Sequence, residues 1–523
     1  MAEINEAASA RDYLFLTIIS TVISCVALAL YFRHGAILLY GDAVAHINIA
    51  RHVFDSRTPG ILELGTVWLP LPHLLDMPFV VNDWMWRTGL GGSIPSMIAY
   101  VTGALGVFRL VRGRASRSAA WIAALIYALN PNLIYMQGTA MTEALYLAFF
   151  IWAVVHFSEF VQAARTDSRQ AAKSLQFCGM TVAAAMLVRY DGWFLAACLA
   201  MALLISVWRL KLRDRVVHRA LVSFVLLTGL TGGLWLAYNH GAYGNAFEFA
   251  TGPYSAHAIA EQSKTSTFPT YPGENSLRVA ALYFLKVSRS NLGEGPLDSW
   301  LISIGFGALL ATIYFSRRHL PLSLLWIPAI FYMGVVAYGS VPIYLPEWWP
   351  YSYYNIRYGL QLLPAVAVFV ALAHEFLRKF ASVRLIAAAV AILVGASYAS
   401  VWLRKPVCVR EAEANGAARL AFDSKLADQL RKLPGSASIM MYCGSHSGAL
   451  QQAGIPFRRV LWEGNHPAWE AGLSGPARAA DYVVAIDRDE VANAVHLFPR
   501  GLLLVATVDT PGQPTALIHR SMR

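Results

Sequence analysis

The chain has 523 residues, 57% of them hydrophobic and only 14% charged, with a mean hydropathy of +0.47 and a net charge of +11. Because a soluble domain carries roughly 25% charged residues, this composition excludes a soluble enzyme, a nucleic-acid-binding domain and a disulfide-built secreted module. Apolar runs of about 20 residues, the length that crosses a bilayer, recur along the chain. The sequence therefore predicts a polytopic membrane protein.

About eleven apolar segments fit a transmembrane helix. The first, residues 14–32, is too long for the apolar part of a signal peptide and is followed by no small-residue cleavage site. We therefore expect it to be a span rather than a cleaved signal. The other segments are residues 93–110, 118–136, 142–161, 175–188, 191–208, 219–238, 298–315, 320–340, 358–377 and 383–402.

Arginine and lysine indicate the orientation, because cytoplasmic loops are enriched in them. With a cytoplasmic N-terminus, the short inner segments are crowded with these residues and the longer outer loops hold few. The inner ones are Arg11, Arg109, Arg112, Arg114, Arg117, Arg165, Arg169, Lys173, Arg209, Lys211, Arg213, Arg215, Arg219, Arg317, Arg318, Arg378, Lys379 and Arg384. The net positive charge of the chain thus mainly reflects its orientation in the membrane. It predicts external loops at 33–92 and 239–297 and an external tail.

The tail, residues 404–523, has ordinary globular composition. Strands are expected at 438–442, 459–462, 482–486 and 502–508, and helices at 411–432 and 488–498. The predicted fold is therefore an all-α polytopic membrane module, residues 1–403, followed by a small C-terminal α/β domain in the periplasm. Cys408 and Cys443 are both external and free to pair. The chain has no Asn-x-Ser/Thr sequon, which favours a bacterial inner membrane.

Charged groups at membrane depth are costly, so each is a functional candidate. Asp42 and His46 follow the first span and are four residues apart, which places them on one face of a helix. Asp42 fits either the N-cap of that helix or a carboxylate base that faces a cavity. His46 fits either a satisfied polar residue or a functional one, with a catalytic, metal-binding or substrate-binding role.

Two further candidates lie at the same outer edge. Glu143 begins a span, where Thr142 or Thr139 could cap the helix and the helix dipole favours a carboxylate. Glu143 is alternatively placed to orient an acceptor, or to join Asp42 around a divalent cation. Arg189 and Asp191 occupy the next outer turn, where they either neutralise each other or contact substrate.

The last candidates, Arg357 and Tyr358, enter a span from outside. Tyrosine and tryptophan residues just before them form an aromatic belt, so an interfacial anchor is one interpretation. The other is phosphate binding by Arg357, because a guanidinium is always charged and forks onto phosphate oxygens.

Carboxylates and arginines at the outer leaflet fit one chemistry in particular, the transfer of a sugar from a polyprenyl phosphate to a hydroxyl. Arginine offsets the charge that grows on the departing phosphate. A carboxylate such as Asp42 takes the proton of the attacking hydroxyl. A single in-line base would invert the anomeric centre.

The order of these motifs resembles the GT-C glycosyltransferases, closest to the family-39-like branch that includes protein O-mannosyltransferases and aminoarabinose transferases. The motifs are Gly41-Asp42-Ala43, Pro70-Leu71-Pro72, Glu143 and Arg357-Tyr358 followed by Pro364, and the resemblance covers residues 14–402. It implies that Asp42 is the catalytic carboxylate and Glu143 the acidic residue of the second loop. It also implies that Arg357 contacts the lipid phosphate and that Arg189 is a second phosphate contact.

Two departures from the family pattern bear on substrate and metal. Ala43 stands where protein O-mannosyltransferases often carry the Glu of an Asp-Glu pair, which leaves the acceptor open among protein, lipid and glycan. The Asp-x-Asp metal motif of oligosaccharyltransferases is absent, so no metal is expected to be obligatory, although a divalent cation remains compatible. The sugar, the oligomeric state and the role of the tail are not specified.

A membrane transporter is the main alternative, together with a ligase or polymerase of lipid-linked glycans. Transporters tend to show internal repeats and binding sites near the midplane of the membrane. This chain has no internal repeat, and its candidate charges cluster at one edge. A glycan ligase would have a similar one-sided site.

Overall fold

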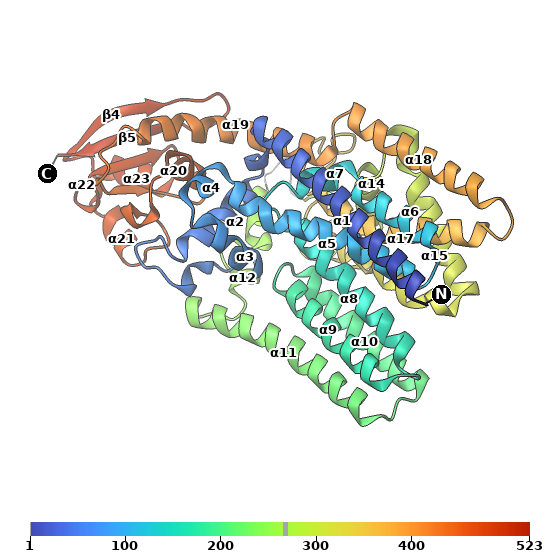
Figure 1. Ribbon diagram of the computed structural model, residues 1–523. Coiled ribbons are helices and arrows are strands. Elements are labelled where there is room, and N and C mark those ends of the chain that lie inside the picture. Colours follow the sequence, from blue (N-terminus) through green and yellow to red (C-terminus); the bar gives the residue numbers. More distant parts are fainter. Residues whose placement is uncertain (1, 265–269, 523) are drawn as a thin grey trace.

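Long helices form a bundle that carries a small sheet domain at one end, and the two chain termini lie at opposite ends of the molecule (Figure 1). The structure is a computed structural model that describes residues 2–264 and 270–522. Helix α19 (Val407–Leu430) leads from the bundle into the sheet domain. The short helices between α1 and α5 lie between the two parts (Figure 1).

Within the described ranges, nine helical stretches are long and apolar enough to cross a membrane. Their helices are α1 (Ala2–Arg33), α5 (Leu90–Arg112), α8 (Glu143–Ala163), α10 (Asp191–Leu210), α11 (Arg215–Tyr243), η3 and α15 (Gly295–Asp298, Trp300–Phe315), η4 and α16 (Arg317–Trp326, Ile327–Tyr338), η5 and α17 (Ile356–Leu362, Leu363–Leu377) and α18 (Val383–Leu403). The protein is therefore a multi-pass membrane protein, as predicted.

The two other predicted spans are helical but differ from the nine. Residues 118–136 form α6 (Arg117–Ala128) and α7 (Pro131–Met136). The break occurs because Pro131 lacks an N–H for the helix ladder and the Asn130 side chain caps α7 by accepting bonds from two backbone N–H groups. The segment predicted at 175–188 belongs to α9 (Ser168–Met186), whose first half is polar.

The external loops predicted at 33–92 and 239–297 contain short helices. The first loop holds η1 (Ala36–Leu38), α2 (Gly41–His52), η2 (Ile61–Leu64), α3 (Leu71–Val80) and α4 (Asp83–Thr88). The long loop holds α12 (Glu248–Thr251), α13 (Ala256–Ser263) and α14 (Leu277–Ser290), and its residues 265–269 lie outside the described residues. Helix α14 packs against α16 and η5, so it helps to position η5.

The tail forms a five-stranded sheet in the order β2-β1-β3-β5-β4. Its strands are β1 (Ile439–Met441), β2 (Val460–Leu461), β3 (Tyr482–Ile486), β4 (Leu502–Val508) and β5 (Ala516–Ser521). Its short helices are α20 (Ser447–Ala453), η6 (Phe457–Arg459), α21 (Ala468–Leu473), α22 (Pro476–Ala479) and α23 (Glu490–Leu497). Strand β1 pairs in parallel with β2 and β3, whereas β5, which the sequence did not predict, pairs antiparallel with β3 and β4. Cys408 and Cys443 are free.

The tail packs directly on the first loop, residues 33–92. The Gln451 side chain of α20 donates to the Trp86 carbonyl at 2.8 Å, and Asn48 of α2 donates to Gln451 at 3.2 Å. Gly416 of α19 lies so close to the Leu39 carbonyl that a Cβ at this position would be 1.8 Å from its oxygen. These contacts fix α19 against the start of α2.

Candidate active site

Charged side chains from widely separated segments meet where α2, α8, η5 and α19 converge. They are Asp42 of α2, Glu143 of α8, Arg189 of the α9–α10 turn, Asp191 of α10, Arg357 of η5 and Glu411 of α19. The side chains form a continuous network of ion pairs. This pairing makes their burial possible, because an unpaired buried charge is very costly.

Arg357 is the centre of the network. Its guanidinium donates to Asp42 at 2.9 Å, to Glu143 at 3.2 Å and to Glu411 at 3.4 Å. The side chains of Glu143 and Glu411 are fully buried, whereas that of Asp42 is 41% exposed. Of these three carboxylates, Asp42 is thus the one that an incoming molecule reaches.

Arg189 extends the network through the same glutamate. Its guanidinium donates to Glu143 at 3.3 Å and to the Tyr332 hydroxyl at 3.0 Å. It also pairs with Asp191 at 3.4 Å, and the Tyr332 hydroxyl donates in turn to Asp191. Glu143 therefore bridges the two arginines. The predicted pairing of Arg189 with Asp191 exists, but within a larger network.

The Tyr358 ring is shared by both guanidinium groups. The guanidinium carbons of Arg357 and Arg189 lie 5.2 and 5.1 Å from its centroid. A cation over an aromatic face is attracted by the ring quadrupole. Burial alone would lower the pKa of Arg189, but Asp191, Tyr332 and Glu143 outweigh it and raise that pKa well above its usual value. Arg189 is therefore a permanent positive charge here.

Local structure explains how α2 and α8 present their carboxylates. Asp42 lies in the first turn of α2, and the N-cap is Tyr40, whose side chain makes no cap bond. The N-cap interpretation of Asp42 is therefore wrong. Thr142 precedes α8, but it too makes no side-chain cap, and its hydroxyl accepts a bond from Arg189 at 3.0 Å instead. Both carboxylates are free to face the arginines.

A pair of buried histidines adjoins the network. His46, one turn after Asp42, lies 2.8 Å from His73 of α3, measured between Nδ1 and Nε2. Burial, with a smaller contribution from the positive charges of Arg189 and Arg357, lowers the pKa of His46 to about 3. Burial also lowers the pKa of His73 far below its usual value. Both rings are neutral at physiological pH, so they supply hydrogen bonds rather than charge.

The sequence had singled out most of the network but not all of it. The structure brings together all the predicted residues: Asp42, His46, Glu143, Arg189, Asp191, Arg357 and Tyr358. Sequence reasoning missed Glu411, Tyr332, Tyr40 and His73. Glu411 follows Val407 by one helical turn, on the buried face of α19, and this spacing was the available signal.

The contacts of Asp42 and Glu143 bear on the divalent cation that the sequence left compatible. Asp42 and Glu143, the carboxylates suggested for a divalent cation, both accept from the Arg357 guanidinium. Among the described residues, no group of three or more His, Cys, Asp and Glu side chains is arranged to hold a metal ion.

Comparison with known proteins agrees with the fold and with the sequence resemblance. Residues 87–235 match the family model described as dolichyl-phosphate-mannose-protein mannosyltransferase. No curated protein matches the chain.

Solved structures of similar fold include ArnT from Cupriavidus metallidurans. Its apo form has a TM-score of 0.62 at 13% identity, over 98% of each chain. Its complex with undecaprenyl phosphate has a TM-score of 0.60 at 13% identity, over 95% of this chain and 97% of that one. The oligosaccharyltransferase of Archaeoglobus fulgidus, in complex with Zn and sulfate, has a TM-score of 0.50 at 13% identity, over 90% of this chain and 68% of that one.

The fold is therefore of the GT-C type, shared with ArnT over nearly the whole chain. The predicted resemblance to GT-C glycosyltransferases is confirmed, and the class that the family match and the fold indicate together is a membrane glycosyltransferase.

Proposed function

We propose that this protein transfers a sugar from a polyprenyl-phosphate donor to a hydroxyl acceptor on the periplasmic face of the inner membrane. One observation carries the proposal: the solvent-accessible carboxylate, Asp42, is held at 2.9 Å by Arg357, which shares the buried Glu143 with Arg189. A base and a site for an anionic leaving group are thus adjacent. The undecaprenyl phosphate bound by ArnT, a protein of the same fold, supports a donor of this class.

In the proposed reaction the arginines receive the donor phosphate. The bond between the anomeric carbon and the phosphate oxygen breaks, and its electron pair remains on that oxygen. Arg357, with Arg189 beside it, stabilises the growing negative charge by charge-assisted hydrogen bonds. Glu143 and Asp191 hold the two guanidinium groups in place before the donor arrives, which lowers the cost of reorganisation.

Asp42 is the proposed base. The acceptor hydroxyl gives its proton to the Asp42 carboxylate as its oxygen bonds to the anomeric carbon, on the side opposite the departing phosphate. This single displacement inverts the anomeric centre. The partial exposure of Asp42 supports the role, because the acceptor must approach from the aqueous side.

The proposed sidedness places the N-terminus in the cytoplasm and the tail, with the site beside it, in the periplasm. It rests on the crowding of arginine and lysine into the short loops at the other end of the bundle. Membrane embedding then lets the polyprenyl chain reach the site sideways between helices.

The test is consumption of lipid donor by purified protein in detergent, with mannose, glucose and arabinose types of polyprenyl-phosphate sugar. We expect one donor to be consumed, and Asp42→Asn to lower turnover about 10²–10⁴-fold, the usual contribution of a general base. Arg357→Ala should also abolish turnover, because leaving-group stabilisation is lost.

Matched controls separate chemistry from folding. Asp428→Asn changes an exposed carboxylate of α19 and Arg278→Ala an exposed arginine of α14, and both should keep wild-type turnover. A fully active Asp42→Asn enzyme would refute the assignment of the base. Failure of every donor to bind or react would move the proposal toward a glycan ligase or a transporter.

A further inference from the structure

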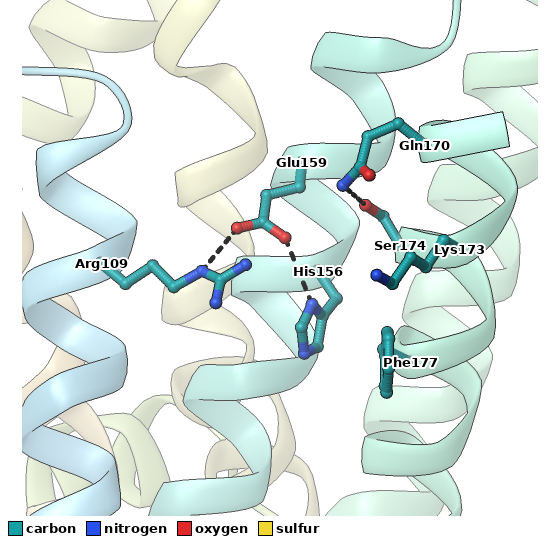
Figure 2. Close-up of a pocket in the computed structure, with 7 residues that line it drawn as sticks. All are labelled: Arg109, His156, Glu159, Gln170, Lys173, Ser174 and Phe177. Atoms are coloured by element: carbon teal, nitrogen blue, oxygen red, sulfur yellow. Dashed lines mark hydrogen bonds and ion pairs between the residues drawn. The ribbon is translucent and has the colours of Figure 1, made fainter. Parts of the chain in front are cut away.

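A pocket lined mainly by polar residues lies among α5, α8 and α9, away from the ion-pair network (Figure 2). Its volume is about 330 Å³. The residues that line it are Arg109, His156, Glu159, Gln170, Lys173, Ser174 and Phe177. A smaller cavity of about 210 Å³ shares Arg109 and Glu159 with it and adds Arg112 and Arg114.

This pocket lies near the opposite membrane surface from the active site. Helix α8 begins at Glu143 in the active site and carries Glu159 near its other end. At a rise of 1.5 Å per residue, the two glutamates are separated by about 24 Å along the helix. That distance approaches the thickness of about 30 Å of the hydrocarbon core of a bilayer. The pocket therefore lies at the membrane–water interface, at the end of the bundle that carries the arginine-rich loops.

Two cationic groups, Arg109 and Lys173, face the pocket, and some of their N–H donors have no acceptor. Glu159 is engaged on both oxygens, by Arg109 Nε at 2.7 Å and by His156 Nδ1 at 3.3 Å. The Arg109 guanidinium pairs with Glu159 and lies 5.3 Å from the centroid of the Trp152 ring, but within the described residues its terminal Nη atoms donate no hydrogen bond. Within the same residues the Lys173 ammonium has neither a hydrogen-bond nor an ion-pair partner. Figure 2 shows the two cations approaching from different helices, with Glu159 and His156 between them. The lining thus has donors available for an added anion.

An apolar strip continues from the pocket toward the centre of the membrane. Lys173, Phe177 and Met180 follow one another at helical spacing on α9, which runs from this end toward the active site. Phe177 is 42% and Met180 57% exposed. The Phe177 ring also stacks on His156 with centroids 5.4 Å apart. A cation at the membrane–water interface suits the head group of a phospholipid, and the exposed apolar side chains nearer the membrane centre suit its acyl chains.

We propose that this pocket binds the head group of an anionic phospholipid. The phosphodiester accepts from the Lys173 ammonium and from the Arg109 Nη atoms, and an acyl chain follows Phe177 and Met180. Basic pockets between transmembrane helices on the cytoplasmic side suit such head groups. The apolar strip favours a lipid over free phosphate, because a soluble anion would gain nothing from it.

The test uses the full-length protein in detergent and native mass spectrometry with phosphatidylglycerol, against phosphatidylcholine of the same acyl chains. We expect preferential retention of phosphatidylglycerol. Lys173→Gln should weaken it roughly fivefold and the double variant with Arg109→Gln roughly 25-fold, since each interfacial cation contributes a similar amount. Phe177→Ser should also weaken retention. Lys379→Gln, an exposed lysine of another short basic loop, should leave it unchanged.

Misfolding would not explain a loss of binding in the single Lys173→Gln variant. The Lys173 side chain is exposed, and α9 does not depend on an ion pair from it. Equal retention of the two lipids would overturn the proposal, and so would Lys173→Gln binding as well as Lys379→Gln. Inorganic phosphate that displaces phosphatidylglycerol completely, or unchanged retention by Phe177→Ser, would identify a site for free phosphate instead.

Discussion

At the scale of single residues, the contact between His46 and His73 determines which ring nitrogen of each histidine carries the proton. Among the residues that the structure describes, buried His73 Nδ1 has no hydrogen-bond partner. An unpaired buried N–H is costly, so the arrangement favours His73 carrying its proton on Nε2 and donating it to His46 Nδ1. His46 then holds its own proton on Nε2, as a neutral donor one turn from Asp42. His73 is in this sense a positioning residue for His46.

Substitution of His73 tests this arrangement. His73→Gln keeps an N–H donor near the position of Nε2 and should leave the KM for the lipid donor within about threefold. His73→Leu removes that donor and should raise KM roughly tenfold, the equivalent of one hydrogen bond to substrate, with a smaller change in kcat. His52→Leu, at another buried histidine of α2, is the control and should leave KM unchanged. Equal KM values for the Gln and Leu variants would contradict the tautomer assignment.

Predictability differs among the residues of the network. Asp42, Glu143 and Arg357 were predictable because a charge beside an apolar span is costly and the topology puts all three at one edge. Tyr332 and His73 were not, since a tyrosine or histidine in an apolar segment is ordinary. Only the packing of distant helices shows that Tyr332 turns toward Arg189 and His73 toward His46.

At the scale of elements, α19 links the tail to the site through Glu411. That carboxylate accepts the backbone N–H groups of Ile356 and Arg357, each at 3.2 Å, and the Tyr40 hydroxyl at 3.0 Å. It thus fastens the first turn of η5, the element that presents Arg357. A tail helix determines where the proposed phosphate contact lies.

We therefore expect Glu411→Gln to affect both stability and function. An amide group in place of one oxygen faces backbone N–H groups that need acceptors, which costs about 1–3 kcal/mol. The thermal midpoint should fall and the KM for donor should rise. Glu413→Gln changes the exposed side chain two residues on, which pairs with Lys405 at 2.9 Å, and should change neither. A lower midpoint with unchanged KM would limit Glu411 to a structural role.

One element boundary was missed although local chemistry decides it. Residues 118–136 were predicted as one span, but Asn130-Pro131 divides them into α6 and α7 because proline cannot continue a helix ladder. Strand β5 was not predicted, since Ala516–Ser521 ends in polar residues and gains its place by pairing with β3 and β4. Pairing of that kind is tertiary and leaves little trace in a short segment.

At the scale of the whole molecule, the composition and apolar runs were enough to predict a polytopic fold with a separate tail. The way in which the tail docks was not predictable. Its contacts with the first loop use individually ordinary residues, such as Gly416 of α19 against the Leu39 carbonyl. Nothing in the local sequence distinguishes this glycine from one in a mobile turn.

Gly416 therefore gives the sharpest test of docking. In Gly416→Ala the added Cβ would meet the Leu39 carbonyl oxygen at 1.8 Å, a backbone atom that cannot swing aside. Helix α19 must shift away from the start of α2, which loosens Glu411 and, through it, η5. We expect faster hydrogen exchange in α19 and in residues 36–48, and at least a tenfold loss of donor turnover. A Cβ added at Gly435 meets no atom of the described residues within 4 Å, so Gly435→Ala should match the wild type in both measurements. If Gly416→Ala showed wild-type hydrogen exchange and wild-type donor turnover, docking of the tail would not be needed to support the active site.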